Sequence, residues 1–98
     1  MTPQKVLEVI EIYRKRLEGL GMEKVDFPHE HLLHSLEIGL CHCHGMLDKI
    51  AGFVKEGRME KAFRWLGFVQ GVFWSSRHYS LEDLKNHNRP PDSRDPSL

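Results

Sequence analysis

Histidine and cysteine residues are concentrated in one part of this sequence, and their side chains are the usual ligands of zinc. The chain of 98 residues contains seven histidines and two cysteines. Most of them fall between residues 29 and 44: His29, His31, His34, Cys41, His42, Cys43 and His44. This density makes metal binding the first chemistry to consider.

Helical spacing decides which of these residues can bind one ion, because the segment has the apolar periodicity of a helix. Two side chains on a helix reach the same ion when they are three or four residues apart. Only His31 with His34 and Cys41 with His44 meet that condition. Each pair is half of a tetrahedral zinc site, which a symmetric dimer would complete. We predict a solvated polar face without a cofactor, and keep zinc across a dimer axis as the alternative.

A second group of candidate residues surrounds two glycines in a predicted helix. Gly67 and Gly71 are four residues apart on its least apolar strip, with Glu60 and Arg64 at the N-terminal end of that strip. Because glycine inside a helix costs ~1 kcal/mol relative to alanine, two of them need a reason. Either another helix packs closely against them, or a ligand lies there, with Arg64 binding an anion and Trp65 or Trp74 stacking on the ligand.

The turn after Trp74 adds cationic and aromatic side chains to this second group. Arg77 and Tyr79 follow within five residues, next to His78. Such side chains bind phosphates and bases, although a simple turn with Tyr79 packed inward explains them as well. The candidate ligand-binding residues are therefore Arg64, Gly67, Gly71, Trp74, Arg77 and Tyr79.

Catalytic motifs are missing from the sequence. It contains no nucleophile elbow, phosphate-binding P-loop or metalloprotease helix motif, and no convincing pair of carboxylates. We therefore predict that the protein is not an enzyme.

Caps and periodicity predict helices and no strand. The first helix starts at Pro3, after the N-cap Thr2, and ends near Gly19. The second enters at Pro28 and continues to about Glu56, with one broad apolar stripe.

Two further helices complete the predicted fold. The third covers residues 58–75, and the short fourth begins at a capping box formed by Ser80 and Asp83. The fold class is therefore all-α, with three main helices and a short C-terminal helix in a single domain over residues 1–89. A proline-rich tail at residues 90–98 is predicted to be disordered.

Two observations predict a homo-oligomer. An unbroken second helix would be ~43 Å long, whereas a compact chain of this size has a radius of gyration of ~13 Å. The helix therefore either kinks near Gly45 or Gly52 or extends into an assembly, and we favour the assembly. The third helix is apolar around roughly 240° of its circumference, which is typical of a helix buried nearly all round. We expect helices two and three to form the interface between subunits.

Composition excludes several classes of protein. The chain balances 14 basic against 14 acidic residues, which argues against a nucleic-acid-binding role because phosphate binding usually requires an excess of basic residues. No apolar run approaches the ~20 residues of a membrane-spanning helix, and the N-terminus lacks an apolar signal segment. Cys41 and Cys43 are two residues apart, which on a helix directs their thiols away from each other. We therefore expect a reducing, cytoplasmic location.

The C-terminal half resembles small proteins of bacteriophage and prophage genomes. The segments that carry the resemblance read EGR at 56–58, RWLGFVQGVFW at 64–74 and YSLEDLKNHNRP at 79–90. The resemblance covers about residues 45–90 and implies an accessory, counter-defence type of protein that acts by binding in a bacterial host. It assigns no role to any residue.

Three functions follow for testing. We predict a non-enzymatic binding protein that acts through a protein–protein surface. The alternatives are an oligomeric sponge that holds a small anionic ligand, such as a nucleotide, between subunits, and a metal-binding helical dimer.

Overall fold

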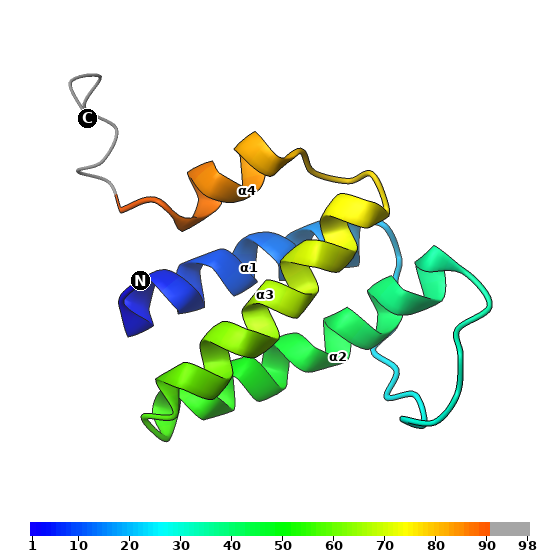
Figure 1. The fold of residues 1–98 in the computed structure, drawn as a ribbon, viewed down its shortest axis with the longest axis horizontal. Helices are drawn as coiled ribbons and strands as arrows, with labels where there is room; N and C mark the ends of the chain where they lie inside the picture. The colour runs from blue at the N-terminus through cyan, green and yellow to red at the C-terminus, as the bar shows by residue number, and fades with distance from the viewer. Residues whose placement is uncertain (91–98) are drawn as a thin grey trace.

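The computed structural model describes residues 1–90 and shows four helices in that part of the chain (Figure 1). They are α1 (Pro3–Gly19), α2 (Leu36–Lys55), α3 (Met59–Ser75) and α4 (Leu81–Asn88). No strand is present in these ninety residues, so the all-α fold class is confirmed. Residues 91–98, which hold nearly all of the predicted disordered tail, lie outside the described residues.

The predicted caps of the first and fourth helices are confirmed. The Thr2 hydroxyl accepts a hydrogen bond from the backbone N–H of Lys5 at 3.0 Å. Ser80 and Asp83 form a reciprocal capping box, in which each side chain accepts from the other residue's backbone N–H, at 3.0 and 2.9 Å. These bonds satisfy N–H groups that a helix leaves unpaired at its N-terminus.

The predicted start of the second helix is wrong. It begins at Leu36, with Ser35 as its extended N-cap, and residues 28–35 are not helical. Most of the apolar residues of 28–35 do not reach the core, and Leu32 remains 92% exposed. A helix there would have buried too little surface to repay its ordering, because tertiary packing supplies most helix stability in proteins.

This shorter helix removes one of the two arguments for an oligomer. Twenty residues span only ~30 Å, and the radius of gyration is 13.8 Å. The apolar stripe of α2 is covered within the chain, between α1 and α3. Its members Leu40, Cys43, Leu47 and Ile50 are fully buried.

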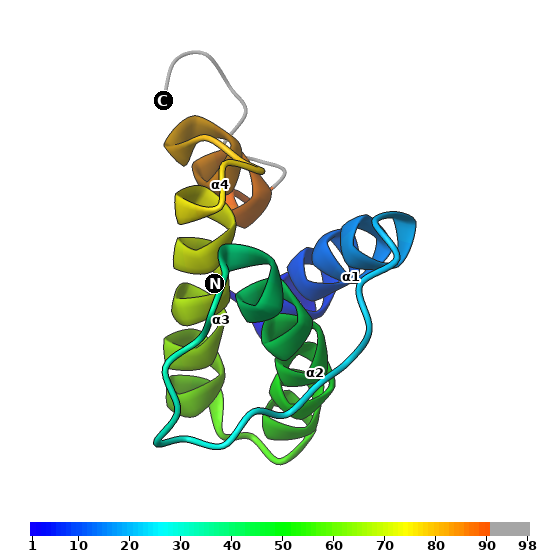
Figure 2. The same cartoon turned by 90° about the vertical axis from the view of Figure 1, so that its right-hand side faces the viewer.

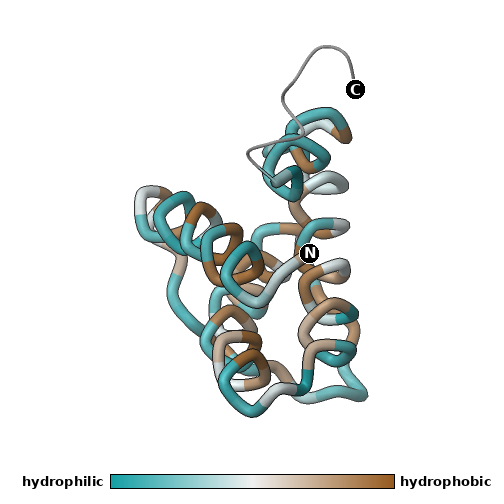
Figure 3. Tube along the Cα trace, turned by 90° about the vertical axis from the view of Figure 1, so that its left-hand side faces the viewer, coloured by the Kyte–Doolittle hydropathy of each residue, from teal (hydrophilic) through white to brown (hydrophobic). Residues whose placement is uncertain are grey.

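The core lies where α1, α2 and α3 meet. The helices α2 and α3 form an antiparallel hairpin, and α4 lies beside α1 near the C-terminal end of α3 (Figures 1 and 2). Along α1, brown apolar and teal polar positions alternate as expected for a helix with one buried face (Figure 3). Leu84 is the residue of α4 that is buried with this core.

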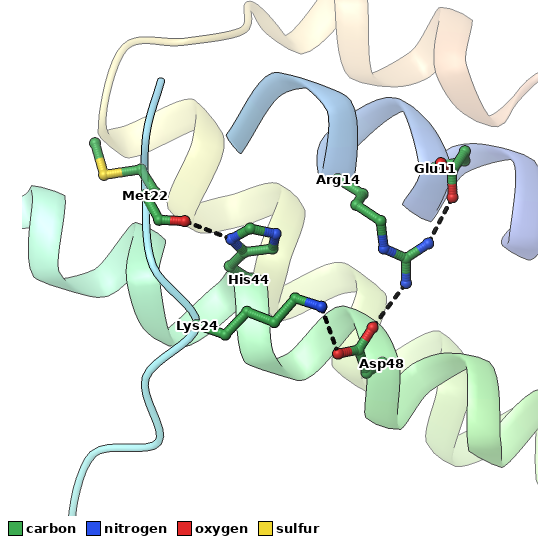
Figure 4. Close-up of polar contacts among 6 residues, drawn as sticks. All are labelled: Glu11, Arg14, Met22, Lys24, His44 and Asp48. Atoms are coloured by element: carbon green, nitrogen blue, oxygen red, sulfur yellow. Dashed lines mark hydrogen bonds and ion pairs between the residues drawn. The ribbon is translucent and has the colours of Figure 1, made fainter. Parts of the chain in front are cut away.

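The segment between α1 and α2 is fastened along α2. Val25 N–H donates to the carbonyl of Cys41 at 3.2 Å, and Phe27 N–H donates to His42 Nδ1 at 3.3 Å. Asp48 of α2 also forms ion pairs at 2.9 Å with Lys24 of this segment and with Arg14 of α1 (Figure 4). These contacts set the path of the chain from α1 to the start of α2.

A candidate binding surface on α3

Two faces of α3 differ in what covers them. Ala62, Leu66, Val69 and Phe73 are buried against the other helices. The opposite side faces solvent, and Figure 2 shows α3 at an edge of the molecule. We call this side the α3 outer face and define it by the following exposed residues: Glu60, Phe63, Arg64, Gly67, Phe68, Gly71 and Trp74. At 100° per residue they occupy an arc of roughly 140°.

Large aromatic side chains make this face unusual for a solvent-exposed surface. Phe63 is 40% exposed, Phe68 56% and Trp74 52%. Burial of apolar surface stabilises by roughly 25 cal/mol per Å². The exposed part of these aromatic side chains therefore contributes no such burial energy to the fold of the single chain. Grouped exposed apolar side chains mark interaction sites more often than isolated ones.

The two glycines lie between these aromatic residues and are open. A Cβ atom added at Gly67 or at Gly71 would meet no atom within 4 Å. No helix among residues 1–90 therefore uses the close approach that paired glycines allow. Within residues 1–90, the packing explanation of these glycines therefore finds no support.

The apolar surface continues from α3 toward the segment before α2. A hollow of about 340 Å³ lies there, and its lining includes Phe27, Leu33, His42 and Phe68. Leu33 is also the nearest neighbour that a Cβ at Gly39 would meet, at 3.5 Å. On the other flank of α3, a hollow of about 250 Å³ is lined by Phe63 and Gly67 among others. The face is therefore bordered by recesses that can receive side chains.

The charges of the α3 outer face are unpaired within residues 1–90. Glu60 and Arg64 have the spacing of a helical ion pair, yet neither forms an ion pair in the part of the chain that the structure describes. Both charged groups remain available to a partner.

The six predicted ligand residues do not form one site in a single chain. Arg64 and Trp74 share the α3 outer face but are ten residues apart, which is ~15 Å along the helix. Tyr79 points away from it, into an aromatic cluster with ring centroids 5.3 Å from Phe73 and 4.8 Å from His87. Burial raises the pKa of Tyr79. One small ligand therefore cannot contact Arg64, Trp74 and Tyr79 of the same chain.

Arg77 stands out by its backbone. The helices α1, α2 and α3 all end in the same motif, with a residue in the left-handed conformation just after the helix. That residue is Gly21 (φ 71°) after α1 and Gly57 (φ 75°) after α2, but Arg77 (φ 70°) after α3. A side chain in this conformation costs roughly 1–2 kcal/mol. An arginine here places an exposed cation directly after the C-terminal end of α3 despite that cost.

A partly buried polar cluster joins α1, α3 and α4 beside the flank of α3 that carries Phe63, and the sequence analysis missed it. The Tyr13 hydroxyl accepts from the Gln70 amide at 3.0 Å and donates to His87 Nδ1 at 2.9 Å, and Gln70 donates to Asn88 at 2.7 Å. Burial raises the pKa of Tyr13 to about 12. A tyrosine and a glutamine on otherwise apolar helix faces were the available signal. Because these groups satisfy one another, the cluster holds α4 in place.

The predicted metal ligands are not brought together. His31 and His34 are exposed in the non-helical segment, so the helical spacing on which that pair depended is wrong. Cys41 and His44 are one turn apart on α2, but His44 Nδ1 lies 2.7 Å from the carbonyl of Met22 and donates to it (Figure 4). Its Nε2 atom is buried without a hydrogen-bond partner in residues 1–90. In the same residues, no three His, Cys, Asp or Glu side chains are placed to hold a metal ion.

Comparisons with known proteins add no relative. No family model matches the chain, and no curated protein or solved structure is significantly similar to it. Over residues 1–90, none of the helices is long and apolar enough to cross a bilayer.

Proposed function

We propose that this protein is a non-enzymatic binding protein, and that another protein chain docks on its α3 outer face. One observation carries the proposal. Three half-exposed aromatic side chains surround two glycines that no atom of residues 1–90 approaches. A covering chain would bury the aromatic surface and use the space above the glycines.

The chemistry of the face favours protein over other ligands. It is mostly apolar, carries one acidic and one basic side chain, and follows a helix of 17 residues, ~25 Å long. Nucleic acid would require an excess of basic residues, and a small ligand would cover only part of this length. Apolar centres with aromatic anchors and charged rims are typical of protein interfaces.

The biological setting of the proposal depends on the resemblance of residues 45–90 to phage-type proteins. On that basis we propose an accessory protein of phage type, with a counter-defence role in the cytoplasm of a bacterial host. Binding alone accounts for such a role, so no reaction is required.

Site-specific photo-crosslinking tests whether a protein occupies the face. A photoreactive phenylalanine replaces Phe68 on the α3 outer face, and in a control variant it replaces Ile12, which is 38% exposed on α1. Both full-length variants are irradiated in bacterial cells that express them. We expect adducts with a protein chain from position 68 and none, or far fewer, from position 12.

An equal yield of protein adducts at positions 68 and 12 would overturn the proposal. If position 68 forms no more protein adducts than position 12, the α3 outer face is not a protein-binding surface. Thermal unfolding of both variants first establishes that they are folded.

The anion-sponge function remains a second candidate because Arg64 has no ion pair in residues 1–90. It requires a site between subunits, since Arg64 and Trp74 of one chain are too far apart. Native mass spectrometry of protein purified gently from cells would then show a retained ligand mass. Loss of this mass in Arg64→Ala would support the sponge, and protein without any added mass would exclude it.

A further inference from the structure

We infer that the chain covering the α3 outer face is a second copy of this protein, with the two α3 helices crossing antiparallel midway between Gly67 and Gly71. This inference rests on the proposed function, because it names the partner of the same face. In this arrangement, Gly67 of each subunit lies against the partner's Gly71. The argument follows from the order of side chains along the face.

A two-fold axis through the middle of the face pairs each residue with a residue of the partner on the same flank of the helix. The two residues lie equally far from Val69 along the chain, in opposite directions. Gly67 and Gly71 are two residues from this point in opposite directions, so they meet across the axis. With no side chain on either, the helix axes can approach more closely than the usual 8–10 Å. Open space over both glycines in the single chain fits this contact.

The aromatic residues also find partners under this symmetry. Phe63 and Trp74 lie on the same flank at opposite ends, so Phe63 of one subunit faces the partner's Trp74. Phe68 lies on the other flank next to the axis and faces the partner's Phe68. The three half-exposed aromatic side chains are thus covered by one another, as a self-complementary two-fold interface requires.

Charge complementarity selects the antiparallel direction. Glu60, nine residues before Val69, faces the partner's turn with Arg77 and His78, which follow Val69 by eight and nine residues. Arg64 faces the C-terminal end of the partner's α3, where backbone carbonyls carry partial negative charge. That last turn contains no basic residue of its own. A parallel pair would instead place Arg64 beside the partner's Arg64 and Glu60 beside its Glu60.

Arg77 gains a role from this arrangement. Its left-handed backbone conformation (φ 70°) is unfavourable for the single chain. In the dimer, its guanidinium lies at the rim opposite the partner's Glu60, which has no ion pair within residues 1–90. The self-complementarity therefore extends from the glycines at the centre to the charges at both ends.

The main test measures the mass of the purified full-length protein by sedimentation equilibrium and native mass spectrometry. At about 100 μM, we expect the parent protein to be a dimer and the double variant Gly67→Leu, Gly71→Leu to be a monomer. Leucine improves helix propensity, and its Cβ meets no atom of residues 1–90 within 4 Å at either position, so we expect this variant to remain folded in dilute solution. The control is Gly19→Leu, at an exposed glycine of α1 that is equally open, and it should dimerise as the parent does.

A charge exchange tests the direction of crossing. Glu60→Arg is expected to weaken dimerisation about tenfold, because two symmetric rim ion pairs are replaced by repulsion. Arg77→Glu added to Glu60→Arg should restore it. If the second change weakens the dimer further, the antiparallel crossing is wrong.

The remaining outcomes separate this inference from the proposed function. A monomeric parent protein at about 100 μM, or a double leucine variant that still dimerises, overturns the inference. If the parent is monomeric while position 68 crosslinks to a different protein in cells, the proposed function stands and the inference falls. If position 68 forms no adduct at all, both fall.

Discussion

The two faces of α3 both carry large apolar side chains, but their surroundings differ. On the inner face, Leu66, Val69 and Phe73 are at most 2% exposed, whereas Phe68 and Trp74 on the outer face are more than half exposed. Both faces are rich in apolar residues, but the other helices of the chain cover only the inner one. Hydrophobic periodicity therefore predicts which residues favour burial, and only the tertiary structure shows which of them are buried.

Adjacent residues allow this difference to be measured most directly. Phe73→Ala should lower the free energy of unfolding by about 3–5 kcal/mol, because it opens a cavity among Tyr13, Tyr79 and the core. Trp74→Ala should lower it by less than about 1 kcal/mol in dilute solution, because the indole is half exposed. Urea unfolding measures both values. Similar losses would mean that the outer face is covered within the chain.

The hydroxyl of Tyr13 on α1 contributes to the stability of the fold through its hydrogen bonds to Gln70 of α3 and His87 of α4. Tyr13→Phe should lower the free energy of unfolding by about 1–2 kcal/mol, because Gln70 and His87 each lose a partner. Tyr79→Phe is the matched control, because no hydrogen bond of the Tyr79 hydroxyl is found in residues 1–90, and it should change stability by less than about 0.5 kcal/mol. Equal effects on the urea midpoint would contradict a structural role for the cluster.

Acidic pH should loosen the same end of the molecule. The pKa of His87 is lowered, first by burial and also by Lys5, while Asp83 partly opposes the shift. The unfolded chain thus binds this proton more readily than the folded chain. The contribution of His87 to the free energy of unfolding is therefore complete above the ordinary pKa of about 6.5. It decreases as the pH falls below about 6.5 toward the lowered pKa of the folded protein. A protonated Nδ1 also cannot accept the bond from Tyr13.

The pH effect is checked by thermal unfolding between about pH 7.5 and 5.5, across the ordinary histidine pKa. The parent protein should lose more stability over this range than His87→Gln, which removes the titrating group. Parallel curves for the two proteins would show that His87 is not the source.

The smallest expected effect has the opposite sign. Arg77→Gly should raise the free energy of unfolding by about 1 kcal/mol in dilute solution, because glycine adopts the left-handed conformation without strain. The control Ser76→Gly, one residue earlier and outside that conformation, should not stabilise. A destabilised Arg77→Gly variant would show that the arginine side chain makes a contact that supports the fold itself.

Local signals in the sequence were sufficient for much of the fold. The Thr2 cap, the Ser80–Asp83 capping box and the periodicity of α1 and α3 act over three or four residues, and all are confirmed. The start of α2 was missed because residues 28–35 continue the apolar pattern but have no core to pack against. Ser35, a good N-cap residue, was the local signal that could have placed the start of α2.

The candidate surface shows the same division between local and tertiary information. Arg64, Gly67, Gly71 and Trp74 share a helix face by spacing alone, so sequence reasoning could group them. The inward position of Tyr79 depends on its packing against Phe73 and His87, which no local pattern specifies. For the same reason, the hydrogen bonds that join Tyr13 to residues more than fifty positions away were not foreseen.

The amino-acid sequence by itself determined the helical class, most helix ends and the side-chain order along α3, because capping and helical periodicity are local properties. Tertiary structure decided which apolar face is covered, where α2 begins, and that Gly67 and Gly71 remain open. These features depend on which helices are available to pack against one another. In residues 1–90, the packed helices cover the inner face of α3 and leave its outer face exposed.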